Sequence, residues 1–304
     1  MKREVRLRVV IPHFFRRKSS ANNEQVSGYG SDRSEERTQR GLALARCLGS
    51  ALSLNRSSND WILNIAEKAI ETTPQSEESF LSEVKVDIHV FVTGEDWLDE
   101  VIDLFSHRIQ THNLQLSTPR YLPLEAVRRT LFDKDLDADY VLYLEDDLII
   151  NDNLFMDKHA WFLKETDFQY VLMPHRVEYA VANTPKRLFV DGPIKPENSQ
   201  HSVWSKNEST VCSGLFCGNQ FVEFVKALNP HSGSFCLGRA QIEKVKNLGS
   251  WPPSLFIGAL ETAATGMVLD NFTILKPRMK FRDFLLLEHG MPSFLSYITE
   301  FPHK

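Results

Sequence analysis

Three consecutive acidic residues, Glu145-Asp146-Asp147, directly follow the apolar run Tyr140–Leu144. Neighbouring carboxylates repel one another, and burial raises the cost of keeping them ionised. A divalent cation removes this difficulty, and an all-oxygen ligand set suits Mg²⁺ or Mn²⁺ completed by substrate phosphates. Open α/β sheets bind ligands beyond the carboxyl ends of their strands. The run is therefore a candidate site for a metal-bound phosphate ligand.

A simpler interpretation of the acidic run also exists. Acidic triplets commonly lie in solvated turns or at helix N-termini, where they satisfy backbone donors. The surrounding sequence favours the metal interpretation, because apolar residues flank the run on both sides. Asn151-Asp152 then supplies a cap for the helix that follows.

The segment Val141–Phe155, VLYLEDDLIINDNLF, resembles the metal-binding segment of GT-A glycosyltransferases. It is most similar to the Glu-Asp-Asp version found in N-acetylglucosaminyltransferases that build on mannose. The resemblance implies that Asp147 contacts the metal directly, while Glu145 and Asp146 lie against the ribose and the metal-bound water. It implies a UDP-sugar more than any other donor. Those transferases carry a membrane anchor, which we do not expect from this sequence, so the acceptor is not carried over.

The residues after the first expected strand are candidates for nucleotide contacts. In GT-A enzymes this strand and its loop meet the base and ribose, and here Pro12-His13 and the loop around Arg33 hold that place. We expect His13 or an aromatic to stack on uracil and Arg33 or Arg37 to reach phosphate. A core position for the neighbouring phenylalanines and a solvated position for the arginines are the alternatives.

Glu261 is the candidate catalytic base. It is the one acid in the small and apolar segment Gly258–Gly266. Inverting GT-A enzymes need a carboxylate that takes the proton of the acceptor hydroxyl, often at a helix start in this part of the chain. A helix N-terminal charge or a structural partner would also explain Glu261. Asp191 and Asp270 are the reserve candidates.

His289, in Leu287-Glu288-His289-Gly290, is a second candidate metal ligand. A late histidine after a strand frequently completes the metal or diphosphate site of GT-A proteins, and neutral imidazole is a competent ligand for Mn²⁺. A purely structural or exposed histidine is the alternative. His231 and Ser232, in a Gly-containing turn, are candidates to hydrogen-bond sugar hydroxyls.

The elements that must position these residues alternate between strand and helix in the first half. Strands are expected at Val5–Ile11, Val84–Thr93 and Tyr140–Leu144, with helices near 42–52, 97–109 and 123–132. This order predicts an α/β fold of GT-A (Rossmann-like) type, with a mixed, mostly parallel central sheet and helices on both faces. Residues 1–150 would form the nucleotide-sugar-binding half and residues 151–304 the acceptor-side half of the same domain, sharing one sheet.

The second half is less regular. Helices are expected at Leu154–Leu163, from Arg239 to about Leu248 and from Ile257 to about Val268. Strands are expected at Tyr170–Val177, Leu188–Asp191, Gly233–Leu237 and Ile274–Pro277. The stretch from Arg16 to Thr38 and the region Lys195–Ser209 read as polar loops.

The composition of the chain argues against some classes of protein. The 304 residues carry 35 basic and 40 acidic side chains, which argues against a nucleic-acid binder. No apolar window is long enough for a membrane span, and Arg6 and Arg8 interrupt the N-terminal apolar stretch. We therefore expect a cytoplasmic protein with reduced cysteines. Arg16 to Lys18, beside two phenylalanines, allows at most peripheral membrane contact.

Three functions remain open at this stage. The first is metal-dependent transfer of a sugar from a nucleotide diphosphate to a hydroxyl acceptor, such as a glycan, glycolipid or small molecule. The second is a sugar-phosphate nucleotidyltransferase, which would need a Gly-rich basic loop where Pro12–Phe15 lies. The third is a non-catalytic binding protein on a GT-A scaffold.

Overall fold

A computed structural model describes residues 3–16, 36–74, 79–179, 187–194, 209–248 and 251–302. Arg33 lies outside these ranges, as do most of the two expected polar loops. No helix within the described part of the chain is long and apolar enough to cross a membrane. No disulfide joins the four cysteines, all of which lie in the described ranges.

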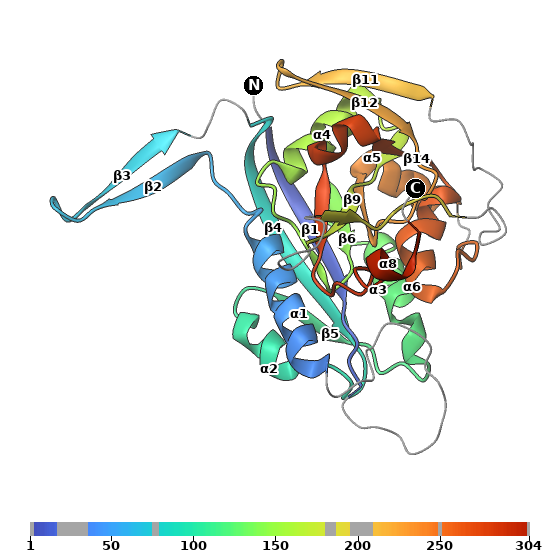
Figure 1. Ribbon diagram of the computed structural model, residues 1–304. Coiled ribbons are helices and arrows are strands. Elements are labelled where there is room, and N and C mark those ends of the chain that lie inside the picture. The colour runs from blue at the N-terminus through green and yellow to red at the C-terminus, as the bar shows by residue number, and fades with distance from the viewer. Residues whose placement is uncertain are drawn as a thin grey trace.

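The central sheet has five strands in the order β13-β6-β1-β4-β5 (Figure 1). Strands β1, β4, β5 and β6 are mutually parallel, and β13 joins β6 antiparallel. The mostly parallel α/β sheet predicted from the sequence is therefore confirmed. The strands span Arg3–Pro12 (β1), Leu81–Val92 (β4), Gln110–Asn113 (β5), Tyr140–Leu144 (β6) and Ser234–Gly238 (β13).

Helices cover both faces of this sheet, as predicted. Alternate residues of β6 point to opposite faces, so Leu142 joins one apolar cluster and Tyr143 the other. Helix α1 (Arg37–Leu52) contributes to the first cluster through Leu44 and its neighbours. Helices α3 (Leu122–Leu131) and α5 (Arg239–Leu248) contribute to the second. Every residue of β6 is buried, which places the acidic run at the end of a core strand.

Two further four-stranded sheets lie beside the central one, in the orders β10-β9-β15-β7 and β11-β12-β14-β8. The second half of the chain therefore reaches the central sheet through β13, and the expectation of one shared sheet is wrong for its other strands. Their bounds are Leu148–Ile149 (β7), Tyr170–Leu172 (β8), His175–Tyr179 (β9), Arg187–Phe189 (β10), Thr210–Phe216 (β11), Gln220–Lys226 (β12), Thr273–Pro277 (β14) and Leu286–His289 (β15).

Two expected elements differ in length. The strand expected at Tyr170–Val177 is divided between β8 and β9 in different sheets, because Pro174 between them has no N–H for a ladder. The helix expected at Trp97–Ile109 is reduced to α2 (Asp99–Ile102) and η2 (Asp103–Phe105), where Leu104 is 71% exposed and extends no apolar stripe. Other helical segments are η3 (Pro119–Tyr121), α4 (Phe155–Glu165), α6 (Ala259–Glu261), η5 (Thr262–Gly266), α7 (Met267–Leu269), η6 (Met279–Phe284) and α8 (Tyr297–Glu300).

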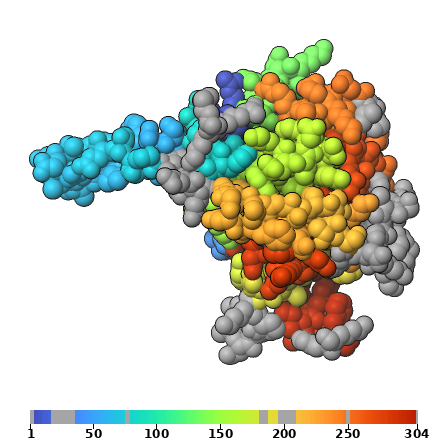
Figure 2. Space-filling view, turned by 90° about the horizontal axis from the view of Figure 1, so that it is seen from above, coloured from blue at the N-terminus to red at the C-terminus, as the bar shows by residue number. Residues whose placement is uncertain are grey.

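A two-stranded hairpin, β2 (Asn59–Asn64) and β3 (Ala69–Pro74), projects from the body of the molecule (Figures 1 and 2). No element was expected from the sequence between residue 52 and Val84. The hairpin was missed because its turn, Ile65–Lys68, contains no glycine or proline, and because three neighbouring apolar residues from Trp61 to Leu63 hide the alternation of a strand.

Helix α4 follows the acidic run and lies deep in the core. Its His159 is fully buried, packs edge-on against Phe155 at 4.7 Å between ring centroids, and has no hydrogen-bond partner among the described residues. Burial lowers the pKa of His159 to about 3. The His159 ring is therefore uncharged in the folded protein at neutral and mildly acidic pH.

Because the unfolded chain protonates this histidine near pH 6.5 and the folded chain does not, stability is lost as the pH falls below that value. Replacing His159→Met should make the loss in unfolding free energy between pH 7 and pH 5 smaller by about 2 kcal/mol. Urea unfolding at both pH values measures this. The exposed His107→Asn serves as control and should follow the wild type; equal losses in all three proteins would contradict the assignment.

Candidate functional site

The acidic run forms the corner between two sheets. Strand β6 ends at Leu144, and the backbone N–H of Glu145 donates to the carbonyl of Gly233 at 3.0 Å. Strand β7 then starts the second sheet by pairing with β15, and the N–H of Gly290 donates to the carbonyl of Asp147 at 2.7 Å. Flanking strands thus fix the backbone of the run on both sides, and its three side chains line one cavity.

That cavity has a volume of about 1010 Å³. It brings together most of the residues singled out from the sequence, although these are far apart in the chain. Its polar wall consists of Arg40, Glu145, Asp146, Asp147, Arg176, His231, Glu261 and His289. Apolar side chains, including Phe14, Leu122 and Leu260, form other parts of its lining.

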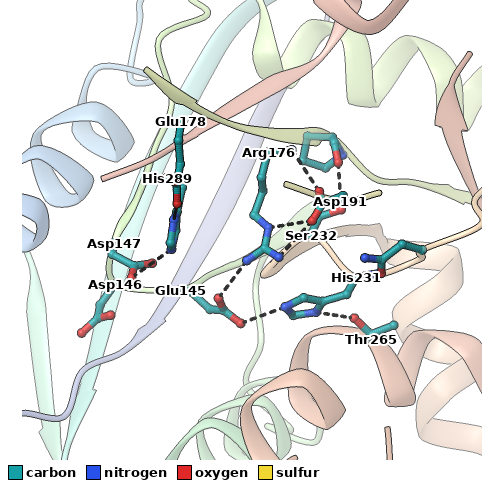
Figure 3. A network of polar contacts seen from close by, with 12 residues as sticks. Glu145, Asp146, Asp147, Arg176, Glu178, Asp191, His231, Ser232, Thr265 and His289 are labelled. Carbon is teal, nitrogen blue, oxygen red and sulfur yellow. Dashed lines mark hydrogen bonds and ion pairs between the residues drawn. The ribbon is translucent and has the colours of Figure 1, made fainter. Parts of the chain in front are cut away.

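Asp147 and His289 face each other within the cavity (Figure 3). The Nε2 atom of His289 lies 3.5 Å from Asp147, while Nδ1 lies 2.6 Å from Oε1 of the fully buried Glu178. Burial alone would lower the pKa of His289, but Asp147 and Glu178 outweigh it and raise that pKa to about 9. Burial would raise the pKa of Asp147, but His289 and Arg40 hold it below its usual range.

Asp146 is held by two residues from the N-terminal part of the chain. His13 is 1% exposed, and its Nε2 accepts the backbone N–H of Leu98 at 3.1 Å. The proton of the neutral ring is therefore on Nδ1, which lies 2.5 Å from Oδ2 of Asp146. His13 thus lies behind Asp146 with both nitrogens engaged. Stacking of His13 on a base stays a prediction, and it would require this buried ring to be uncovered.

Arg40 of α1 connects the two aspartates. Its guanidinium lies 3.3 Å from carboxylate oxygens of both Asp146 and Asp147, and the residue is 7% exposed. Burial opposes the charge on Arg40, but Asp146 and Asp147 outweigh it, and the pKa of Arg40 is raised. Arg33 or Arg37 was predicted from the sequence to reach phosphate, and Arg40 was not singled out. Arg33 lies outside the described residues, and Arg37 pairs with Glu100 on the surface at 2.6 Å.

Glu145 lies in a different environment. Its Oε2 is 3.9 Å from Arg176 and its Oε1 is 3.8 Å from Nε2 of His231, yet Oε1 has no hydrogen-bond partner among the described residues. Burial raises the pKa of Glu145 to about 8, against the opposing effect of Arg176. His231 is neutral, because burial and then Arg176 lower its pKa well below the usual value. The contact between Glu145 and His231 is therefore not an ion pair.

Arg176 is itself fixed by Asp191. Its Nε donates to Oδ1 of Asp191 at 3.0 Å, and Lys276 donates to Oδ2 at 3.0 Å (Figure 3 shows the Arg176 contact). Burial would raise the pKa of Asp191, but the two cations lower it below its usual range. A carboxylate so tightly paired is a poor proton acceptor, so Asp191 is unsuited to the reserve role of base. Asp270, the other reserve, accepts the N–H of Ser254 at 2.7 Å.

Glu261 lines the same cavity from the start of α6. It is 7% exposed, and its Oε2 is buried without a hydrogen-bond partner among the described residues. Burial raises the pKa of Glu261. Backbone N–H groups of Glu261 and Gly258 oppose this rise, and no charged partner is among its causes. The helix continues as the π-helical turn η5, a distortion that often occurs at functional sites. A buried carboxyl group with a raised pKa has the properties that a general base needs.

His231 and Ser232 differ in orientation. The Nδ1 atom of His231 lies 2.9 Å from the Thr265 hydroxyl, and the ring lines the cavity. Ser232 is fully buried and donates to the carbonyl of Pro174 at 2.8 Å. The His231 ring therefore remains available to a ligand in the cavity. The Ser232 hydroxyl is instead bonded to the segment between β8 and β9.

The residues present fit a divalent cation that has two protein ligands. No group of three or more potential metal-binding His, Cys, Asp or Glu side chains is found in the described ranges. The pair Asp147–His289 nevertheless has the arrangement of a metal site, because Glu178 orients the ring through Nδ1 and directs Nε2 toward the carboxylate. A cation bound there would replace the proton on Nε2 of the charged ring. Mg²⁺ and Mn²⁺ commonly take their other ligands from phosphates and water.

Gly233 determines how closely β13 approaches the acidic run. Its φ is +61°, and a Cβ atom there would lie 2.5 Å from Oε2 of Glu145. Gly94 has a similar φ of +57° with open space around it. Gly94→Ala should therefore cost about 1 kcal/mol in unfolding free energy for the backbone alone. Gly233→Ala should cost about 1–3 kcal/mol more, from overpacking against Glu145. Urea unfolding of both variants tests this; equal costs would show that Glu145 moves away freely.

Comparison with known proteins gives no family for this chain. No protein family model matches the sequence, and neither does any curated protein. Two solved structures with some likeness are crystal structures of residues 1–349 of S. aureus TarS, alone and in complex with UDP-GlcNAc, both at 12% identity. Their TM-scores are 0.32 and 0.30; the match covers 61% of this chain and 39% or 37% of those chains. The chain thus spans well under half their length, and at this distance the functional argument rests on the site itself.

Proposed function

We propose that this chain is a metal-dependent glycosyltransferase that moves a sugar from a nucleotide diphosphate, UDP by preference, to a hydroxyl acceptor. One observation carries the proposal. The same cavity contains a carboxylate–histidine pair suited to a cation and the buried carboxyl group of Glu261, whose pKa is raised. Sugar transfer needs both. The leaving diphosphate gains negative charge, which a cation stabilises, while the attacking hydroxyl must give its proton to a base.

The donor's diphosphate would lie at the Asp147 end of the cavity. Asp147 and His289 would hold Mn²⁺ or Mg²⁺, which supplies positive charge to the departing diphosphate. Glu178 keeps the His289 ring in the orientation that this requires. Glu145 and Asp146 lie next to Asp147 and would face the ribose and the water around the cation. Arg176 adds a fixed positive charge at the same wall.

Glu261 would act on the acceptor. Its carboxylate takes the hydroxyl proton as the acceptor oxygen forms a bond to the anomeric carbon, and the bond from that carbon to the diphosphate oxygen breaks. A single displacement of this kind inverts the anomeric centre. The transferred group would be a hexosyl or N-acetylhexosaminyl unit, and the acceptor a glycan, a glycolipid or a small molecule.

Replacement of Asp147 by asparagine tests the diphosphate site. In the wild type, UDP with Mn²⁺ should raise the unfolding temperature by several degrees, because a ligand at about 100 times its dissociation constant adds about 2.7 kcal/mol. The rise should need both components, should vanish with EDTA, and should be absent in Asp147→Asn. The exposed Asp135→Asn is the control and should respond like the wild type. No shift with UDP or GDP would refute the site and leave a non-catalytic binding protein.

Replacement of Glu261 by glutamine tests the base. Glu261→Gln keeps the size of the side chain but cannot accept the proton, so kcat should fall about 10²–10⁴-fold. The thermal shift with UDP and Mn²⁺ should be unchanged, because Glu261 is not one of the residues that would hold the cation. Asp270→Asn is the matched control and should retain its kcat. Turnover is measured as UDP released from a UDP-sugar with acceptor; wild-type kcat in Glu261→Gln would exclude it as the base.

A further inference from the structure

The projecting hairpin β2–β3 is an unusual feature for an isolated protein. It is a sheet of only two strands, separate from the other sheets, and both views show it extending away from the body (Figures 1 and 2). Four of its large apolar side chains are more than half exposed: Trp61 at 75%, Leu63 at 64%, Ile65 at 77% and Ile70 at 57%. Exposed apolar clusters of this kind mark interaction sites.

The register of the two strands sorts these side chains onto one face. Directly opposed residues share a face, so the pairs Trp61–Thr72 and Leu63–Ile70 lie together. This face, called the apolar arm face, consists of Trp61, Leu63, Ile70 and Thr72. It carries no charge and offers a bulky indole beside a small threonine.

The opposite face carries the charged side chains of the two strands. It contains the pairs Asp60–Thr73, Ile62–Glu71 and Asn64–Ala69. The Asn64 amide donates to Glu71 at 2.6 Å across the strands. Its large apolar residue, Ile62, is 48% exposed, whereas Trp61 and Leu63 of the apolar arm face are 75% and 64% exposed.

The net negative charge of the hairpin argues against a lipid surface as the partner that covers the apolar arm face. The hairpin carries three acids, Asp60, Glu67 and Glu71, against the single base Lys68. Anionic lipid headgroups attract basic segments and repel acidic ones. A second copy of this chain meets no such penalty, because the charged side chains lie on the opposite face or in the turn and point away from an apolar-to-apolar contact.

We propose that the apolar arm face is the contact through which two copies of this chain form a two-fold dimer. A two-fold contact places the same surface on both sides, so it must be self-complementary. An uncharged face with Trp61 beside Thr72 meets this condition, because the indole of one copy packs over the small threonine position of the other. Tryptophan is also the residue type most enriched among the energetic centres of interfaces.

A dimer would also explain how the two-stranded hairpin remains folded. An isolated two-stranded hairpin is marginally stable in water, and it needs further strands or packing on its apolar face. The body of the same chain does not supply that packing, as the exposure of Trp61 and Leu63 shows. A second hairpin laid on the apolar arm face supplies it. This contact is independent of the sugar-transfer proposal, because no hairpin residue lines the cavity.

Sedimentation velocity over a range of protein concentrations, with a reductant present, tests the proposal. The wild type should sediment as a concentration-dependent dimer. The double variant Trp61→Thr/Leu63→Thr should raise the dimer dissociation constant by about 30-fold or more, the effect of losing one energetic centre. The matched control Asp60→Thr/Ile62→Thr changes the same strand on its other face and should dimerise like the wild type. Circular dichroism and thermal unfolding verify that the body of each variant is folded.

Several outcomes would overturn the dimer. A monomeric wild type at all concentrations would do so, as would a dimer that the Trp61→Thr/Leu63→Thr variant leaves intact. Equal weakening by the control pair would show that the apolar arm face is not the contact. A monomer that co-sediments with anionic phosphatidylserine vesicles through Trp61 would assign the face to a membrane instead.

Discussion

Three adjacent carboxylates share one cavity wall, and each is balanced in a different way. Asp147 has the imidazolium of His289, Asp146 has Arg40 and the Nδ1 proton of His13, and Glu145 has only the more distant Arg176. Without these partners the like charges would repel one another in a poorly solvated site. The partners come from α1, β9, β15 and the end of β1, so the packing of those elements against the end of β6 and the ionisation of the acidic run depend on each other.

The carboxyl groups of this cavity wall differ in protonation, because their charged partners lie at different distances. Asp147 remains ionised because its cations outweigh its burial, whereas Glu145 has a pKa near 8 and is largely protonated at neutral pH. One group is therefore suited to a cation and its neighbour to donating a hydrogen bond. Glu261, which lines the same cavity, has a raised pKa with no charged partner. A cavity whose acidic groups differ in this way can treat a diphosphate and a hydroxyl group differently.

The sequence was sufficient for features that are contiguous in the chain. The acidic run, the strands β1, β4 and β6 and the amphipathic α1 each carry a local pattern, and the mostly parallel sheet followed from their order. Arg40, Arg176 and Glu178 were not found, because an arginine on a helix or a glutamate in a strand has no local signal until tertiary contacts pair it. The β2–β3 hairpin was missed for a different reason: three neighbouring apolar residues, Trp61-Ile62-Leu63, hide the alternation of a strand.

The origin of the wall in distant parts of the chain has a consequence for how the protein is made. His13 and His289 meet the same acidic run although they are far apart in the sequence, and β15 can join β9 and β7 only after all three have been synthesised. Contacts of such high sequence separation form late, since loop closure must precede them. A chain still emerging from the ribosome would therefore have most of its central strands before it had a complete cavity. Ligand binding would then report that the chain has been made and folded as far as β15.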